Sequence, residues 1–400
     1  MHLGTQTGVF TILQTSAVPI EYPFFPERLA KFGYNRYMVG KWHLGYCKHD
    51  YLPTKRGFEK FFGYYGGAEN YYTHKEDTHI DKTKYKGVDF FHDTEASFSN
   101  KWHKKDKYST EVFANETIAL LEEQNKEKPF YIYLAFQAVH APLQPPPSKY
   151  LSAKCSNITR KERRIYCGMV HALDSAVGKV VAKLKDLDMY NNTIIIFSSD
   201  NGGETAQGGN NYPLRGNKNT LWEGGTRINS FVHSPANIQE HAVRKQMFHV
   251  VDWYATILGM AGSHMNTYGD GINQWDMIKN NSKANNRRRF VYNVEADRAA
   301  IRDGDYKLIT GKPGEPDGWI PPQKKSSHSP KSKNQTAWLF NIKADPNERH
   351  DLSVKKPSIL HKMMLKLRRW SVTAVPSVRQ SADPRGDPKH FNGTFASGWC

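Results

Sequence analysis

Residues 193–203 read Thr-Ile-Ile-Ile-Phe-Ser-Ser-Asp-Asn-Gly-Gly, an apolar β-branched run that stops at a carboxylate, a carboxamide and two glycines. An uninterrupted apolar run of this kind is typical of a strand in a parallel sheet that is covered on both faces. Asp200 and Asn201 would then lie at the carboxyl end of that strand, where open α/β sheets build their sites. Two neighbouring oxygen donors followed by glycines suit a hard cation such as Ca²⁺ or Mg²⁺. The alternative is an ordinary Asp-Asn-Gly turn that binds nothing.

Two further apolar runs end at basic residues. The run 36–43 delivers Lys41 and His43, and the run 129–140 delivers His140. If the three strand ends meet at one edge of one sheet, they combine cation-binding oxygens with a lysine and two histidines, which favours a site. Taken singly, each residue has an ordinary structural alternative: Lys41 as a surface lysine and His43 as a packing residue beside Trp42.

Five short segments, in the order of the chain, carry a resemblance to a known family. They are GKWHLG (40–45), PTKRGF (53–58), SDNGG (199–203), PLRGNK (213–218) and LWEGG (221–225). With these segments the chain resembles the sulfatase family. The segments 62–74 and 208–213 resemble its arylsulfatase B branch, and the resemblance extends to residues 339–352.

The resemblance implies a fold and an activity. The implied fold is α/β and alkaline-phosphatase-like, with a mixed sheet flanked by helices and a smaller C-terminal antiparallel sheet plus helix. The implied activity is sulfuric ester hydrolysis, with aryl sulfates or the sulfated N-acetylgalactosamine units of glycosaminoglycans as substrates. We place the catalytic domain at residues 1–262 and a C-terminal subdomain at residues 263–400.

The resemblance also assigns roles to residues of the candidate site. Positioned cations stabilise the charge that spreads over a transferring sulfuryl group, and a general acid and base move its protons. Matched to the family, Lys41 and Lys218 would contact the sulfate, His140 would donate a proton and His43 would act as a base. The ligands of one Ca²⁺ would be Asp200 and Asn201.

Two features of the family do not occur in the sequence. Family members carry an Asp-Asp pair that binds calcium and a C-x-P-x-R segment whose cysteine is oxidised to formylglycine, the nucleophile. The chain has no Asp-Asp dipeptide, and none of its four cysteines lies in such a segment. We therefore expect either an N-terminally truncated chain or a pseudoenzyme that binds sulfated glycans without turnover. With the upstream Asp pair and nucleophile strand missing, at least one central strand edge and some apolar surface should lie uncovered. A phosphodiesterase of the same superfamily is disfavoured by GKWH and WEGG.

The charge balance points to an anionic partner. The chain has 400 residues, of which 38% are hydrophobic, and its formal net charge is +17. Nucleic acid is the general expectation for such an excess. However, the basic clusters 160–164, 287–289 and 324–325 are scattered and no nucleic-acid-binding module is present, so we expect no nucleic-acid partner. A sulfated polysaccharide is also an anionic partner that this positive charge would attract. No run is long enough to span a membrane.

Sequons and cysteines favour a lysosomal or secreted protein, although the first twenty residues are not a convincing signal peptide. N-x-[ST] triplets begin at Asn115, Asn157, Asn191, Asn280, Asn334 and Asn392. Cys155 and Cys167 are close enough to close a short loop, which leaves Cys47 and Cys400 as a long-range pair or as free thiols.

Periodicity and chain breakers predict the remaining elements. We expect helices at 25–32, 110–123, 163–187, 246–260 and 358–370, and a hairpin over 300–310 that turns at Asp303-Gly304 and follows a strand at 290–295. In the helix 163–187, a stripe from Ile165 to Leu184 should pack on the sheet, and 311–336 should be a long exposed loop. Trp222 and Glu223 are structural candidates. The tyrosines 64, 65, 71 and 72 either line a sugar site or pack in the core.

Overall fold

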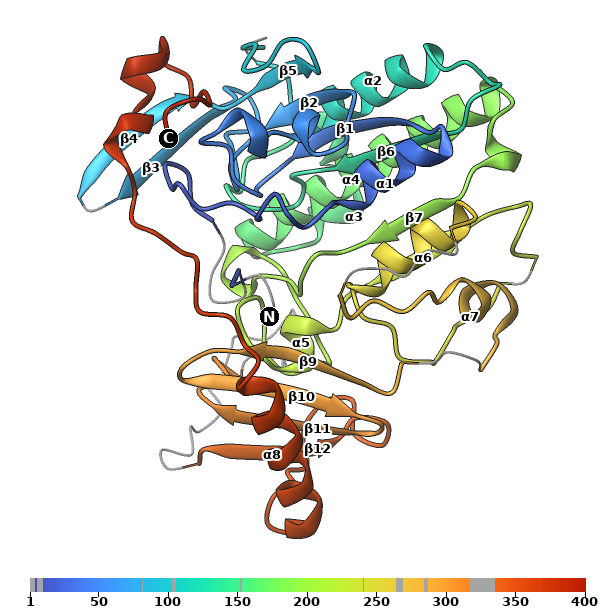
Figure 1. Cartoon of the computed structure of the whole chain (residues 1–400), viewed down its shortest axis with the longest axis vertical. Coiled ribbons are helices and arrows are strands. Elements are labelled where there is room, and N and C mark those ends of the chain that lie inside the picture. Colours follow the sequence, from blue (N-terminus) through green and yellow to red (C-terminus); the bar gives the residue numbers. More distant parts are fainter. Residues whose placement is uncertain are drawn as a thin grey trace. The chain divides into compact units, whose positions relative to one another are not determined.

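The computed structural model describes residues 4–5, 10–80, 82–102, 106–151, 153–239, 241–263, 269–283, 287–316 and 335–400. These residues form two compact units (Figure 1). The described residues within Gly8–Thr193, Ile257–Tyr268 and Val378–Cys400 form the first unit, and those within Ile194–Thr256 and Gly269–Ser377 form the second. Most of the predicted loop 311–336, including Asn334 and the 324–325 cluster, lies outside the described residues.

The first unit is built on a mixed four-stranded sheet with the order β5-β2-β1-β6. Its strands are β1 (Asn35–Lys41), β2 (Lys60–Tyr64), β5 (Phe91–Thr94) and β6 (Phe130–Ala135). β1 pairs in parallel with β2 and β6, whereas β5 runs antiparallel to β2. No described strand of this unit pairs with the other edge of β6, where Tyr133 is 48% exposed. The expectation of a strand edge uncovered by a missing segment stays a prediction.

Alternation along β1 divides its side chains between two apolar layers. Tyr37 and Val39 pack with Phe113 of α2 (Ser109–Glu122), while Met38 points into the opposite layer. α4 (Lys161–Asp186) packs on α2. The unit also contains α1 (Phe25–Leu29), α3 (Ala153–Ser156) and a hairpin of β3 (Lys75–Ile80) with β4 (Thr83–Val88).

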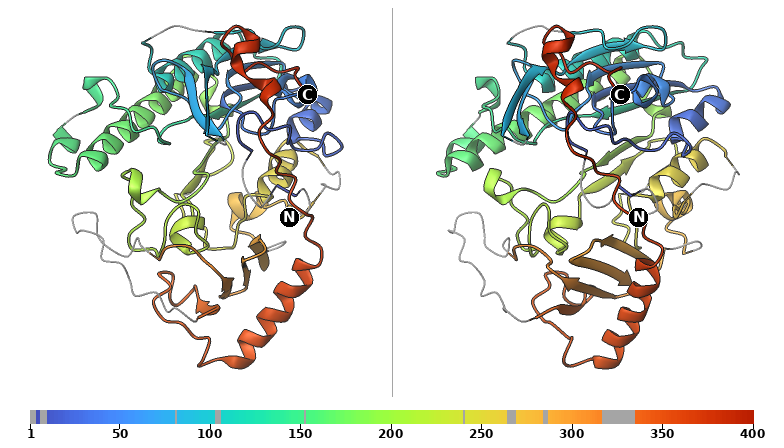
Figure 2. Two further views of the ribbon diagram at one scale, coloured as in Figure 1. Left: turned by 90° about the vertical axis from the view of Figure 1, so that its left-hand side faces the viewer. Right: turned by 60° about the vertical axis from the view of Figure 1, so that its left-hand side comes forward.

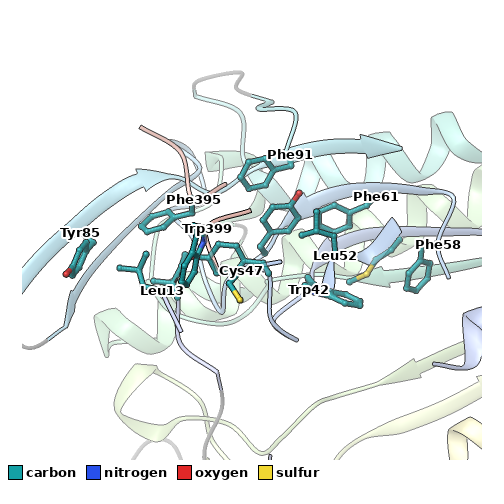
Figure 3. Close-up of a cluster of buried hydrophobic side chains, with 14 residues drawn as sticks. Leu13, Trp42, Cys47, Leu52, Phe58, Phe61, Tyr85, Phe91, Phe395 and Trp399 are labelled. Atoms are coloured by element: carbon teal, nitrogen blue, oxygen red, sulfur yellow. Dashed lines mark hydrogen bonds between the residues drawn. The ribbon is translucent and has the colours of Figure 1, made fainter. Parts of the chain in front are cut away.

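The layer opposite α2 is closed by segments from both ends of the chain. Leu13, Trp42, Phe395 and Trp399 are buried in one cluster, and the close-up in Figure 3 shows these side chains together with Cys47. A disulfide joins Cys47 to Cys400, 353 residues apart in sequence. The second disulfide joins Cys155 to Cys167, so both proposed pairs are confirmed and no cysteine is free.

The second unit contains a four-stranded antiparallel sheet with the order β12-β11-β10-β9. Its strands are β9 (Arg289–Val294), β10 (Arg298–Asp303), β11 (Tyr306–Gly311) and β12 (Ala337–Asn341). The helix α8 (Pro357–Ser371) lies along one face of this sheet, as Figure 2 shows, and buries Met363 and Leu367 against Ile301 and Leu308. The predicted hairpin and C-terminal helix are confirmed, as is the fold class.

The remaining elements of the chain are short. β7 (Ile195–Ser198) pairs with β8 (Ser230–His233), and the helices are α5 (Glu223–Thr226), α6 (Asp252–Met260) and α7 (Trp275–Asn280). Among the described residues, no helix is both long and apolar enough to cross a membrane.

Three sequence predictions differ from the structure. β7 pairs antiparallel with β8 and its apolar residues are half-buried, so the expectation of a buried parallel strand is wrong; an apolar β-branched run predicts a strand but not the direction of its partner. The 246–260 helix begins only at Asp252, whose carboxylate accepts the backbone N–H of His249. In α4 the buried face includes Met169, Ala172 and Ala176, because this helix packs on α2 rather than directly on the sheet.

Gly178 of α4 offers a local test of this arrangement. A Cβ at this position would meet no atom within 4 Å, and the residue is exposed. Because alanine reduces the backbone entropy of the unfolded chain, Gly178→Ala should raise the free energy of unfolding by about 0.5–1 kcal/mol. Urea unfolding of the two proteins measures the difference. A loss of stability would show that this face of α4 is covered.

Candidate active site

Lys41 ends β1 at a point where the backbone of β1 approaches β6 closely. Gly40 precedes it with φ of 107°, and a Cβ on Gly40 would overlap the carbonyl group of Ala135. Only glycine permits both this conformation and this approach. The register pairs Lys41 with Tyr64 of β2, so the strand end that carries the lysine is held by a neighbouring strand.

His43 follows Lys41 in a left-handed conformation, with φ of 57°. Its backbone N–H donates to the carbonyl of Tyr65 (3.1 Å), and Nε2 lies 2.5 Å from the carbonyl oxygen of Phe10. A carbonyl only accepts, so Nε2 carries a proton and Nδ1 is the basic atom of the neutral ring. Gly67 leaves room for this ring, because a Cβ there would lie 2.8 Å from Cε1.

A buried carboxylate fixes the segment that holds His43. Asp89 accepts the backbone N–H groups of Tyr65 and Gly66, each at 2.8 Å, and is fully buried. Burial raises the pKa of Asp89 to about 8, although these two hydrogen bonds favour its charged form. Sequence reasoning missed Asp89, because it has no motif of its own and only the fold brings it against residues 65–66.

His140 lies in the loop after β6. Its Nδ1 lies 2.7 Å from the carbonyl oxygen of Ala141, so Nδ1 carries a proton and donates it to that carbonyl. The His140 carbonyl accepts the hydroxyl of Tyr71 at 2.9 Å. Tyr71 is buried and stacks on Tyr108, with ring centroids 5.1 Å apart. Tyr64 and Tyr65 are also buried, so these tyrosines pack in the core and only Tyr72 is half-exposed.

Asp200 and Asn201 occupy the turn after β7, in the second unit. Asp200 is exposed, and its Oδ1 accepts the backbone N–H of Asn201 at 2.8 Å. The Asn201 amide group donates through Nδ2 to the carbonyl of Gly202 at 2.8 Å. This bond fixes the orientation of the amide, so its oxygen is turned away from Gly202 as an acceptor.

The residues after this turn are tied to the loop that carries Lys218. Asn211 accepts the N–H of Gly203 at 2.7 Å and donates to the Gly203 carbonyl at 2.9 Å. The backbone N–H of Lys218 donates to the same carbonyl at 3.3 Å. Sequence reasoning gave Asn211 no role, although it lies in the quoted segment 208–213. The six predicted residues are divided between the two units: Lys41, His43 and His140 belong to the first, and Asp200, Asn201 and Lys218 belong to the second.

Comparison with known proteins identifies the family. Residues 2–263 match the family model described as Sulfatase. The chain belongs to the sulfatase family.

Relatives of this sulfatase support the assignment. Arylsulfatase J of Mus musculus is 36% identical over 430 residues, which cover 100% of this chain and 70% of the relative. N-acetylgalactosamine-6-sulfatase of Homo sapiens is 29% identical over 249 residues, covering 61% of this chain and 46% of the relative. The chain thus spans less than half the length of this second relative. These matches establish the family without singling out its arylsulfatase B branch.

Solved structures agree with the fold of this sulfatase. The crystal structure of Ps i-CgsB has a TM-score of 0.79 and 27% identity, and covers 98% of this chain and 85% of its own. The same protein in complex with k-i-k-neocarrahexaose has a TM-score of 0.78 and 26% identity, with the same coverage.

The family implies a calcium ion, and the donors of this sulfatase fit part of its coordination. Ca²⁺ takes about six to eight oxygen ligands, including carboxylate and amide oxygens. Asp200 and the oriented Asn201 amide supply two such donors on one turn. In the described part of the chain, no group of three or more His, Cys, Asp or Glu side chains is placed to hold a metal. The calcium ion therefore stays a prediction, to which these residues contribute two oxygen donors.

Proposed function

We propose that this sulfatase acts on sulfated N-acetylgalactosamine units of glycosaminoglycans, in the manner of the arylsulfatase B branch. The observation that carries the proposal is that all six candidate residues lie within residues 2–263, the part that matches the family model. The relative named N-acetylgalactosamine-6-sulfatase and the excess of positive charge support a sulfated amino sugar as the substrate class.

The proposed roles follow from the chemistry of each side chain. Lys41 and Lys218 bind the sulfate oxygens and stabilise their developing charge. His140 transfers a proton to the leaving oxygen through Nε2, since its Nδ1 is occupied by Ala141. His43 acts as a base through Nδ1, since its Nε2 is directed to Phe10. A calcium ion held in part by Asp200 and Asn201 supplies Lewis acidity when bound. The boundary between a catalytic domain at 1–262 and a C-terminal subdomain stays part of the proposal.

A second candidate function is binding of sulfated glycans without turnover. All four cysteines are joined in disulfides, so none is available for oxidation to formylglycine. Loss of a covalent nucleophile typically removes several orders of magnitude in rate. We therefore propose that the chain alone binds sulfate esters without measurable turnover, and that adding a family segment with an oxidised C-x-P-x-R cysteine restores hydrolysis.

The disulfides and sequons support a lysosomal or secreted location. Disulfides persist in oxidising compartments. The asparagines of the five described sequons, Asn115, Asn157, Asn191, Asn280 and Asn392, are all exposed, as glycosylation requires.

Binding of a sulfated amino sugar tests this function. Calorimetry with 4-sulfated N-acetylgalactosamine should show binding that Lys218→Ala weakens by about 10-fold or more, because a charge-assisted hydrogen bond contributes about 1.5–3 kcal/mol. The matched control is Lys343→Ala in the same unit, which also removes one positive charge. The Lys343 side chain is 77% exposed, and its long 4.0 Å contact with the Asp305 carboxylate makes only a weak ion pair. Equal weakening in both variants, or no binding at all, would contradict the proposed role of Lys218. The 6-sulfated sugar, measured in parallel, shows which ester is preferred.

A further inference from the structure

A buried lysine lies between two buried carboxylates in the second unit. Lys307 of β11 is fully buried, and its Nζ lies 2.9 Å from Oε1 of Glu223 and 2.9 Å from Oε1 of Glu348. Tyr292 of β9 donates its hydroxyl to Glu223 at 3.0 Å, and its ring lies 4.4 Å from the lysine Nζ. Removing charges from water is costly unless they are paired in this way. The cluster therefore fixes where Glu223 lies.

Glu223 is the first residue of α5, a helix that needs outside support. α5 has four residues, and a helix of this length is not stable by itself. The backbone N–H of Glu223 donates to Oε2 of Glu348 at 2.7 Å, and the indole N–H of Trp222 donates to the carbonyl of Gly314 at 3.1 Å. The position of α5 is thus set by contacts with Lys307 of the sheet, with Gly314 after β11 and with Glu348 after β12.

α5 in turn contacts the turn that carries Asp200 and Asn201. The N–H of Gly202 donates to the carbonyl of Gly225 at 3.0 Å, and a Cβ on Gly202 would overlap the carbonyl oxygen of Gly224. Because the two backbones are this close, the turn that carries Asp200 and Asn201 is held in a single position relative to α5. Lys307, Glu223, the α5 backbone and Gly202 therefore form a continuous series of contacts that ends beside Asn201.

We propose that Lys307, acting through Glu223, is a positioning residue that holds α5 against Gly202 and so fixes the Asp200-Asn201 turn for cation binding. The role of the turn in binding a cation rests on the proposed function. The placement of the turn by Lys307 rests only on the contacts described. Neither Lys307 nor Glu223 is among the proposed cation ligands, which are Asp200 and Asn201.

Hydrogen exchange measures the placement directly, without a metal. In the full chain, Lys307→Met should speed exchange of the Gly202 amide by about 10-fold or more, because the N–H bond to Gly225 opens more often. Two isosteric variants each remove one negative charge from the cluster. Glu223→Gln weakens the link to α5 and should speed exchange several-fold, whereas Glu348→Gln keeps the Lys307–Glu223 pair and an acceptor for the Glu223 N–H, and should have little effect. Both glutamine variants leave Lys307 one carboxylate partner, so folding should be retained.

A second buried ion pair controls for general loss of stability. Arg287 and Asp252 are buried in the same unit, with Nε 2.8 Å from Oδ2, and the other hydrogen bonds of Arg287 go to Asp270 and Arg289. Arg287→Met should lower the free energy of unfolding but leave Gly202 exchange close to that of the parent. Unchanged exchange in Lys307→Met and Glu223→Gln, or equal acceleration in Arg287→Met, would overturn the proposal.

Terbium luminescence separates this inference from the proposed function. Tb³⁺ is an oxygen-seeking probe of calcium sites, and Asp200→Asn should weaken its binding if the turn holds a cation. Lys307→Met should then weaken it as well, by about 10-fold, while Arg287→Met should not. If Asp200→Asn has no effect but Lys307→Met still speeds Gly202 exchange, the positioning stands and the metal assignment fails.

Discussion

Replacing Gly202 with alanine is expected to disrupt the candidate cation site and to destabilise the second unit. The added Cβ would overlap the carbonyl oxygen of Gly224, with further close contacts to Gly225, and these are backbone atoms that cannot rotate away. Forcing a methyl group into a packed position typically costs about 1–3 kcal/mol. The turn must therefore move away from α5, which breaks the bond from Gly202 to Gly225 and displaces Asp200 and Asn201.

Terbium affinity and urea unfolding measure the two effects of Gly202→Ala. We expect affinity to fall by about 10-fold or more and the free energy of unfolding to fall by about 2 kcal/mol. Gly203→Ala is a graded control, because a Cβ there would lie 3.2 Å from Asn211 Oδ1 and 3.3 Å from the nearest backbone nitrogen, contacts that a small shift relieves. Equal effects at both positions would show that the contact between the turn and α5 is not what fixes the site.

The protein is expected to be more stable at pH 5 than at pH 8, by a few kcal/mol. Burial raises the pKa of Asp89 to about 8, of Glu76 and Glu348 to about 7, and of Asp93 to about 6. Neighbouring negative charges raise three of these pKa values further. The pKa of Asp89 is raised by Glu76 and Glu69, and that of Glu76 by Asp77 and Glu69. The pKa of Glu348 is raised by Glu223. A carboxyl group whose pKa is raised by folding binds its proton more tightly in the folded state. Its contribution is therefore present at low pH and is lost as pH rises from the unfolded pKa through the folded pKa.

The pKa of one half-buried histidine, His249, makes stability depend on pH in the opposite direction. Burial and Arg287 lower the pKa of His249 to about 4, so its contribution is lost as pH falls below the ordinary histidine range. Because four carboxyl groups favour low pH and only one imidazole opposes them, we expect the pH of maximum stability to lie on the acid side of neutrality. Urea unfolding at pH 5, 6, 7 and 8 measures the profile. Glu348→Gln should flatten it between about pH 5 and pH 7, where this carboxyl titrates. A profile that is flat, or that rises toward pH 8, would contradict the expectation.

Local patterns predicted the elements whose partners lie close in sequence. The expected helix 358–370 and the hairpin turning at Asp303-Gly304 agree with α8 and with the β10–β11 pair, because both signals are local. The partner of β7 could not be predicted in this way, since β7 ends at Ser198 and β8 begins only at Ser230, 32 residues later. Likewise, the apolar residues of α4 predict a buried face but not whether a helix or a sheet covers it.

In the candidate site, too, residues in local motifs could be predicted from the sequence, whereas residues that act from distant segments could not. Asp200, Asn201 and the glycines after them were recognised from one contiguous segment, and Lys41 and His43 from another. The residues that hold these segments in place were not recognised. Asp89 accepts hydrogen bonds from residues 65–66, and Lys307 pairs with Glu223, which is 84 residues away in sequence. A supporting side chain of this kind is recognisable only once distant segments have packed, because its residue type and sequence neighbours are ordinary. The grouping of all six residues into one pocket stays a prediction.

Residues 395–400 complete the core of the first unit, and this constrains how the protein is made. Phe395 and Trp399 fill the same cluster as Leu13 and Trp42, and Cys400 is bonded to Cys47. Residues 395–400 are synthesised long after Leu13, Trp42 and Cys47, so the first unit cannot finish folding until they have left the ribosome, whereas many domains fold as they emerge. Until then, the apolar layer opposite α2 stays open in the nascent chain. The Cys47–Cys400 bond then has to form in an oxidising compartment.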